Sequence, residues 1–104
     1  MYSSAYVWAK IVSYLEERLG AITVSTHLDD AEIVELNDLN LIIYSASDFR
    51  REIIRRRYTS HIEDALKDVF NSSARLIVFD ENELAAFQQK GKSLTAMDFN
   101  PQFS

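Results

Sequence analysis

The stretch that decides the fold of this chain is "SDFRREIIRRRYTSHIEDAL", residues 47–66. Its apolar residues recur at intervals of three and four, and the pattern continues to residue 70. The apolar positions are Phe49, Ile53, Ile54, Tyr58, Ile62, Leu66, Val69 and Phe70. This spacing predicts a long helix with one buried side. Ser47 stands where an N-cap belongs, and Asp48 adds negative charge to the first turn.

The same stretch packs five arginines into eight residues, in a chain whose formal net charge is -5. They are Arg50, Arg51, Arg55, Arg56 and Arg57. At about 100° per residue they cannot share one helix face. Glu52 precedes Arg56 by four residues, a spacing that allows an ion pair. Three interpretations stay open: a solvated helix face, weak contact with single-stranded DNA, or docking of an acidic protein.

Composition places the chain among globular proteins of the size of one domain. It has 104 residues, of which 47% are hydrophobic, and it contains no cysteine. The absence of cysteine excludes disulfides and thiolate metal sites and is compatible with a reducing cytosol, so we expect a cytoplasmic protein. No apolar run approaches the roughly 20 residues that cross a bilayer, so we expect no membrane span. Because the chain is acidic, any binding of nucleic acid should be local and sensitive to salt.

Working outward from the central stretch, the flanking segments predict an α+β fold. Helical spacing runs over residues 6–19, with Ser3 or Ser4 as N-cap and Gly20 at the end, and residues 21–28 fit a short second helix. Residues 31–36 and 40–45 read as a β-hairpin, and residues 74–79 as a third strand. The predicted order is α-α-β-β-α-β, a three-stranded sheet packed on helices. We expect one domain over residues 5–80 and a linker or tail over 81–104, with a short helix near 84–89 and no periodicity from Lys90 onward.

The sequence contains no pattern that indicates catalysis or a bound cofactor. A Gly-rich phosphate loop, a nucleophile elbow and a His-Glu-x-x-His motif are all missing from it. His27 and His61 fall on different predicted helices without a carboxylate at a telling spacing. Asp29, Asp30 and Glu32 could hold a cation, but a solvated turn is the expected state. We therefore predict no catalytic residue, no metal and no cofactor.

Three segments, read in order, resemble the N-terminal domain of the bacterial chromosomal replication initiator DnaA. The first is "VWAKIVSYLEERL" with Trp8, the second is "LIIYSASDF" at residues 41–49, and the third is "RRRYTSHIEDAL" at residues 55–66. The resemblance covers about residues 6–79. The last residues, "DFNPQFS", resemble the entry to the ATPase domain of that family, so we expect a first domain, a short linker and the start of a further domain. The chain departs from the family in having Ala46-Ser47 where Pro-Asn is usual.

The resemblance implies a K-homology-like interaction domain that has no enzymatic activity of its own. It implies self-association through Trp8 with Val7, and contact with the replicative helicase and with regulatory proteins of initiation through Thr23 and Phe49, beside Asp48. Thr23 replaces the acidic residue usual in the family. Trp8 and Phe49 could each instead belong to the core. The alternatives are a K-homology-type module that binds single-stranded nucleic acid through the five arginines, although it lacks the Gly-x-x-Gly clamp, or a stand-alone adaptor.

Overall fold

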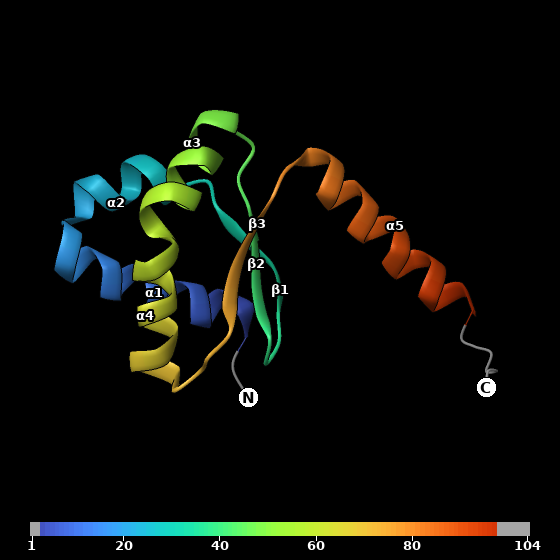
Figure 1. Cartoon of the computed structure of the whole chain (residues 1–104), viewed down its shortest axis with the longest axis horizontal. Helices are drawn as coiled ribbons and strands as arrows, with labels where there is room; N and C mark the ends of the chain where they lie inside the picture. Colours follow the sequence, from blue (N-terminus) through green and yellow to red (C-terminus); the bar gives the residue numbers. More distant parts are fainter. Residues whose placement is uncertain (1–2, 98–104) are drawn as a thin grey trace.

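The computed structural model describes the backbone of residues 3–97 and the side chains of residues 3–90. Figure 1 shows the elements in chain order. They are α1 (Ser4–Leu19), α2 (Ala21–Leu28), β1 (Glu32–Leu36), β2 (Asn40–Tyr44), α3 (Asp48–Ile53), the π-helical turn η1 (Ile54–Tyr58), α4 (Thr59–Phe70), β3 (Arg75–Phe79) and α5 (Glu81–Met97). The predicted α-α-β-β-α-β order is therefore confirmed, with α5 added at its end.

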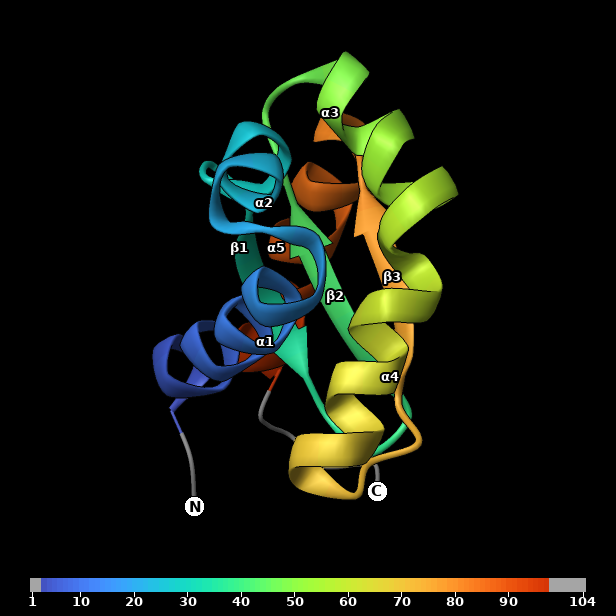
Figure 2. The same ribbon diagram turned by 90° about the vertical axis from the view of Figure 1, so that its left-hand side faces the viewer.

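The chain forms a sheet with most of its helices on one side. The strand order is β1-β2-β3, with β1 and β2 antiparallel and β2 and β3 parallel. Helices α1, α2 and α4 lie in front of the sheet in Figure 2, and α5 lies behind it. The α3–η1–α4 segment connects the two parallel strands, because such strands need a long crossover. Every helix in the described part of the chain is too short or too polar to span a membrane.

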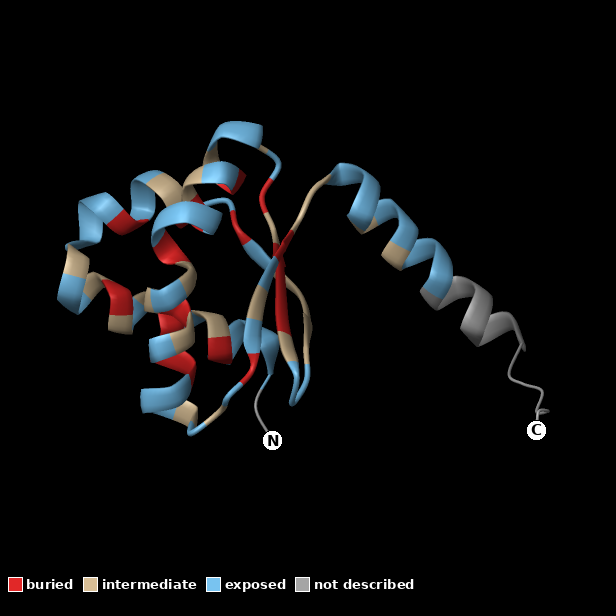
Figure 3. Cartoon of the chain, viewed as in Figure 1, coloured by how far each residue is buried: buried red, intermediate tan, exposed pale blue. Residues whose placement is uncertain are grey.

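The core lies between the sheet and these helices, where the buried residues gather in Figure 3. Strand β2 lies at the centre of the sheet and contributes Leu41 and Ile43, both completely buried. Helix α1 contributes Ile11 and Leu15, and the long helical segment contributes Ile54, Ile62 and Leu66. Burying large aliphatic side chains is worth about 2 kcal/mol each, so the apolar side of residues 53–66 contributes much of the stability of the fold. Phe49, at the start of the predicted apolar side, is exposed.

The ends of the helices are fixed by the residues that the sequence indicated. The Ser3 hydroxyl accepts a hydrogen bond from the Tyr6 amide at 3.1 Å, so Ser3 rather than Ser4 caps α1. The Ser47 hydroxyl accepts one from the Arg50 amide at 3.2 Å. Gly20, with φ of 93°, ends α1 in a conformation that most residues avoid. These contacts are local, which is why sequence alone predicts them.

A β-bulge in β1 was not predicted from the sequence. The register shifts between Ile33 and Glu35, and this extra residue allows Ile33 and Leu36 both to pack against the core. Strict alternation would place these two residues on opposite faces. The bulge also puts Glu32 and Glu35, the partners of Tyr44 and Ile42, on the outer face of the sheet.

Two further features differ from the prediction. The helix over residues 48–70 is interrupted by η1, so the face assignments based on 100° per residue do not hold across it. Helix α5 extends to Met97, where we expected a linker from Lys90 onward. The segment 98–104, which resembles the entry to an ATPase domain, lies outside the described residues. The division into a domain at 5–80 and a tail stays a prediction.

Candidate functional site

Exposed side chains on α2 and α3 form the clearest candidate surface. Phe49 is 73% exposed and Ile22 is 83% exposed, although both are large and apolar. Thr23 and Asp48 are also exposed. We call these four residues the α2–α3 surface, because the two helices contact each other. Phe49 is therefore outside the core, which answers the question that the sequence left open.

The acidic loop that follows α2 holds α2 against α3. The Arg50 guanidinium lies 2.7 Å from an Asp29 carboxylate oxygen and 3.2 Å from one of Asp30. Asp30 also accepts a hydrogen bond of 2.9 Å from the hydroxyl of Ser45, which is fully buried. The loop thus joins helices, and no group of three metal-binding side chains occurs among the described residues.

Tyr58, in η1, provides a second link to α2. Its buried hydroxyl lies 2.8 Å from Nδ1 of His27 and donates a hydrogen bond of 3.3 Å to the carbonyl of Thr23. Burial raises the pKa of the Tyr58 phenol, while the charge of Arg57 opposes that shift. The π-helical turn therefore places the Tyr58 hydroxyl against α2, the helix that carries Ile22 and Thr23, and hydrogen-bonds it there. The α2–α3 surface is held in place before any partner arrives.

Arg51 is buried, which removes it from the predicted nucleic-acid-binding cluster. Its side chain is 3% exposed and donates a hydrogen bond of 2.5 Å to the Ser45 carbonyl. It also pairs with Asp48, and its guanidinium lies 5.8 Å from the centre of the Tyr44 ring. A guanidinium enclosed in this way holds the start of α3 against the end of β2 and is not accessible to a phosphate in this structure.

The remaining arginines divide into two groups. Arg55 donates a hydrogen bond of 2.8 Å to the Val78 carbonyl, so it ties η1 to β3 just as Arg50 ties α3 to the acidic loop. Arg56 is 75% exposed and pairs with Glu52 at 3.0 Å, as its spacing predicted. Arg57 is exposed and has no ion pair among the described residues. Within this cluster of arginines, Arg56 and Arg57 thus present their charge mainly to solvent, and Arg55 is 41% exposed.

The predicted self-association pair on α1 is only partly accessible. Val7 is buried in the core, so its side chain cannot contact a second molecule directly. Trp8 is half-buried and packs against the core. Trp8 lies near the start of α1, where Tyr6 is also exposed. Trp8 therefore packs against the core and keeps part of its surface exposed, while self-association through it stays a prediction.

Comparison with protein families gives a match over the helices that carry these side chains. The family model of the DnaA N-terminal domain matches residues 5–68. The chain belongs to this family. The match begins in α1, ends near the end of α4, and includes Trp8, Thr23 and Phe49. The DnaA N-terminal domain is a non-catalytic interaction domain of a DNA replication initiator. Strand β3 and helix α5 lie beyond the matched residues.

The sequence indicated most of this surface but missed Ile22. A signal for it exists, since Val24 and Leu28 are the buried residues of α2. Ile22 lies two residues before Val24, about 200° around a helix, and therefore points away from the core. An apolar residue on the solvent-exposed face of a helix in a DnaA N-terminal domain is a candidate for partner contact.

Proposed function

We propose that this domain assembles replication-initiation complexes by self-association and by contact with the replicative helicase and regulatory proteins. The observation that supports the proposal most is the exposure of Phe49 and Ile22 on neighbouring helices. Large apolar side chains in water gain free energy when a partner covers them, and aromatic residues are frequent at the energetic centres of interfaces.

The fixed geometry of the α2–α3 surface supports this function. Arg50 holds α3 against the loop after α2, and Tyr58 holds the backbone of Thr23. A surface that is already ordered loses little conformational entropy on binding. Since Thr23 carries no charge, we expect the helicase contact to be mainly apolar and only weakly dependent on salt.

The test is a titration of the purified domain with the purified replicative helicase of the same cell, in which isothermal titration calorimetry measures the heat of binding. We expect saturable binding with a negative heat-capacity change, because apolar surface is buried. The absence of binding heat at several temperatures, together with no co-sedimentation, would contradict the proposed helicase contact.

Self-association through Trp8 gives a separate prediction. Replacing Trp8 with alanine should weaken self-association about tenfold or more, because the indole offers more contact area than any other side chain. Sedimentation velocity over a range of concentrations measures this effect. The matched control is Val12→Ala, which also removes a half-buried side chain of α1 that packs against the core. Equal weakening by both substitutions would assign the effect to packing within α1 and would remove Trp8 from the interface.

Weak binding of single-stranded DNA is a second candidate function, favoured by the exposure of Arg56 and Arg57. With two phosphate contacts, log affinity should fall against log salt concentration with a slope of roughly 1.4. Fluorescence anisotropy with an oligothymidine measures this slope. Arg56→Ala with Arg57→Ala should abolish the binding, and unchanged binding by this double variant would exclude the two arginines as the site.

A further inference from the structure

The two outer edges of the sheet differ in how far side chains form hydrogen bonds with their backbone. On β3, the Leu76 amide donates a hydrogen bond of 2.9 Å to the Glu63 carboxylate, and the Val78 carbonyl accepts one of 2.8 Å from Arg55. Side chains of the adjacent helical segment therefore satisfy part of this edge. Proteins cover strand edges in such ways because unpaired backbone groups invite pairing with another chain.

Strand β1 lacks this protection. Within the described part of the chain, no side chain makes a hydrogen bond to the backbone of β1 (Glu32–Leu36), and none of its residues is fully buried. In an antiparallel pair, every second residue directs its N–H and C=O away from the partner strand. Strand β1 therefore presents backbone donors and acceptors to its surroundings, whereas two of those on β3 are bonded by side chains.

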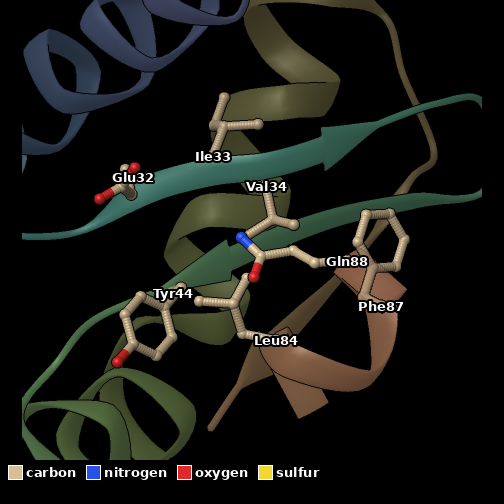
Figure 4. Close-up of a pocket in the computed structure, with 7 residues that line it drawn as sticks. All are labelled: Glu32, Ile33, Val34, Tyr44, Leu84, Phe87 and Gln88. Atoms are coloured by element: carbon tan, nitrogen blue, oxygen red, sulfur yellow. The ribbon is translucent and has the colours of Figure 1, made fainter. Parts of the chain in front are cut away.

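An open groove lies beside β1 on the outer face of the sheet. It has a volume of about 490 Å³ and lies between the β1–β2 hairpin and the start of α5 (Figure 4). The residues that line it are Glu32, Ile33, Val34, Tyr44, Leu84, Phe87 and Gln88. Phe87 packs edge-on against Phe79 of β3, with ring centres 5.7 Å apart, so the wall formed by α5 rests on the sheet.

An exposed edge next to an apolar groove is the arrangement by which sheets bind extended peptides. The peptide backbone pairs with the edge strand, and alternate side chains enter the neighbouring pocket. Here Val34, Leu84 and Phe87 would receive the side chains on the outer face. A strand next to β1 would lie about 4.8 Å from it, within reach of this groove.

The charge of this region defines the partner. The bulge places Glu32 and Glu35 on the outer face, and Glu81 and Glu83 occupy the first turn of α5. A second copy that paired through β1 would bring these glutamates close to one another, which is unfavourable. Nucleic acid would meet the same repulsion. A segment with basic side chains is complementary to this edge.

We propose that β1 is a docking edge for an extended segment of a partner protein that carries basic and apolar residues together on the face turned toward the groove. The segment adds to the sheet as a fourth strand, with its basic side chains near Glu32 and Glu35 and its apolar side chains in the groove. This site is separate from the α2–α3 surface and from Trp8, and it does not depend on the function proposed for either. It uses α5, which lies beyond the residues matched by the family.

The probe for this proposal is a nine-residue peptide with both ends blocked, in which the even positions are lysine or valine and the odd positions are threonine. Lysine and valine then share one face of the extended peptide. It is titrated into the ¹⁵N-labelled chain, and backbone amide shifts are followed by NMR. We expect saturable shifts at residues 32–36 and 84–88. A peptide with glutamate in place of lysine should bind at least about tenfold more weakly. A peptide N-methylated at two adjacent central residues should also lose binding, since adjacent N–H groups point to opposite edges of a strand and one of them must face β1.

Binding of the N-methylated peptide with equal affinity would overturn strand addition, as would shifts confined to other elements or no shifts at millimolar peptide. The double variant Glu32→Lys with Glu35→Lys should weaken binding of the lysine peptide roughly fivefold. The matched control, Glu17→Lys with Asp64→Lys, makes the same change in net charge at exposed positions of α1 and α4. Equal weakening by both double variants would show that only net charge matters and would contradict the site.

Discussion

Replacing Phe49 with alanine should weaken binding of the replicative helicase about thirtyfold or more. The ring is 73% exposed in the isolated domain, so a partner that covers it gains its full burial. Truncating an aromatic residue at the centre of an interface costs about 2 kcal/mol or more. The free energy of unfolding should change by less than about 0.5 kcal/mol, because the ring contributes little to the core. Calorimetric titration and urea denaturation measure the two quantities.

The chain offers a matched control for Phe49. Leu39 lies in the turn between β1 and β2, at the opposite end of the sheet from α3 in Figure 1, and is 76% exposed. Leu39→Ala removes a similar exposed apolar side chain and should leave helicase binding unchanged. If Phe49→Ala bound as tightly as the native chain, or if Leu39→Ala weakened binding equally, the α2–α3 surface would not be the contact.

Replacing Arg51 with alanine should lower the free energy of unfolding by about 2 kcal/mol. Hydrogen bonds to a charged group contribute about 1.5–3 kcal/mol, and the substitution leaves the Ser45 carbonyl without its donor. The partner Asp48 is largely exposed, so its ion pair adds little to this effect. Arg51→Lys should recover only part of the loss, because an ammonium cannot reproduce the planar guanidinium fork. Urea denaturation followed by circular dichroism measures these differences.

Arg57→Ala serves as the comparison within the same cluster. Arg57 is exposed and has no ion pair in the described part of the chain, so its removal should change stability by less than about 0.5 kcal/mol. Equal stability of the Arg51 and Arg57 variants would contradict the distinction between structural and exposed arginines. It would also return Arg51 to the candidates for nucleic-acid contact.

Local signals account for what the sequence predicted correctly. The apolar spacing over residues 49–70, the serine caps and the turn between β1 and β2 each depend on residues close together in the chain. These signals were sufficient for the element order and for the α+β class. Phe49 and Thr23 were indicated by the resemblance to the DnaA N-terminal domain and not by these local signals.

Tertiary contacts account for what the sequence did not reveal. Arg51 is buried because the Ser45 carbonyl and the Tyr44 ring meet it in the folded chain, and no local pattern marks that meeting. The bulge in β1 and the π-helical turn are adjustments that bring Ile33 and Tyr58 onto the core. Residues Val7 and Trp8 share a helix, yet only contact with the core shows which of the two stays accessible.

The most direct test of the central claim is the NMR footprint of the helicase on the ¹⁵N-labelled domain. Our account states that this initiator domain works through a fixed apolar surface on α2 and α3. It predicts that amide signals of residues 22, 23, 48 and 49 shift or broaden first, while those of residues 36–40 at the other end of the sheet stay unchanged. A footprint that omits α2 and α3, or the absence of any change at saturating helicase, would contradict it.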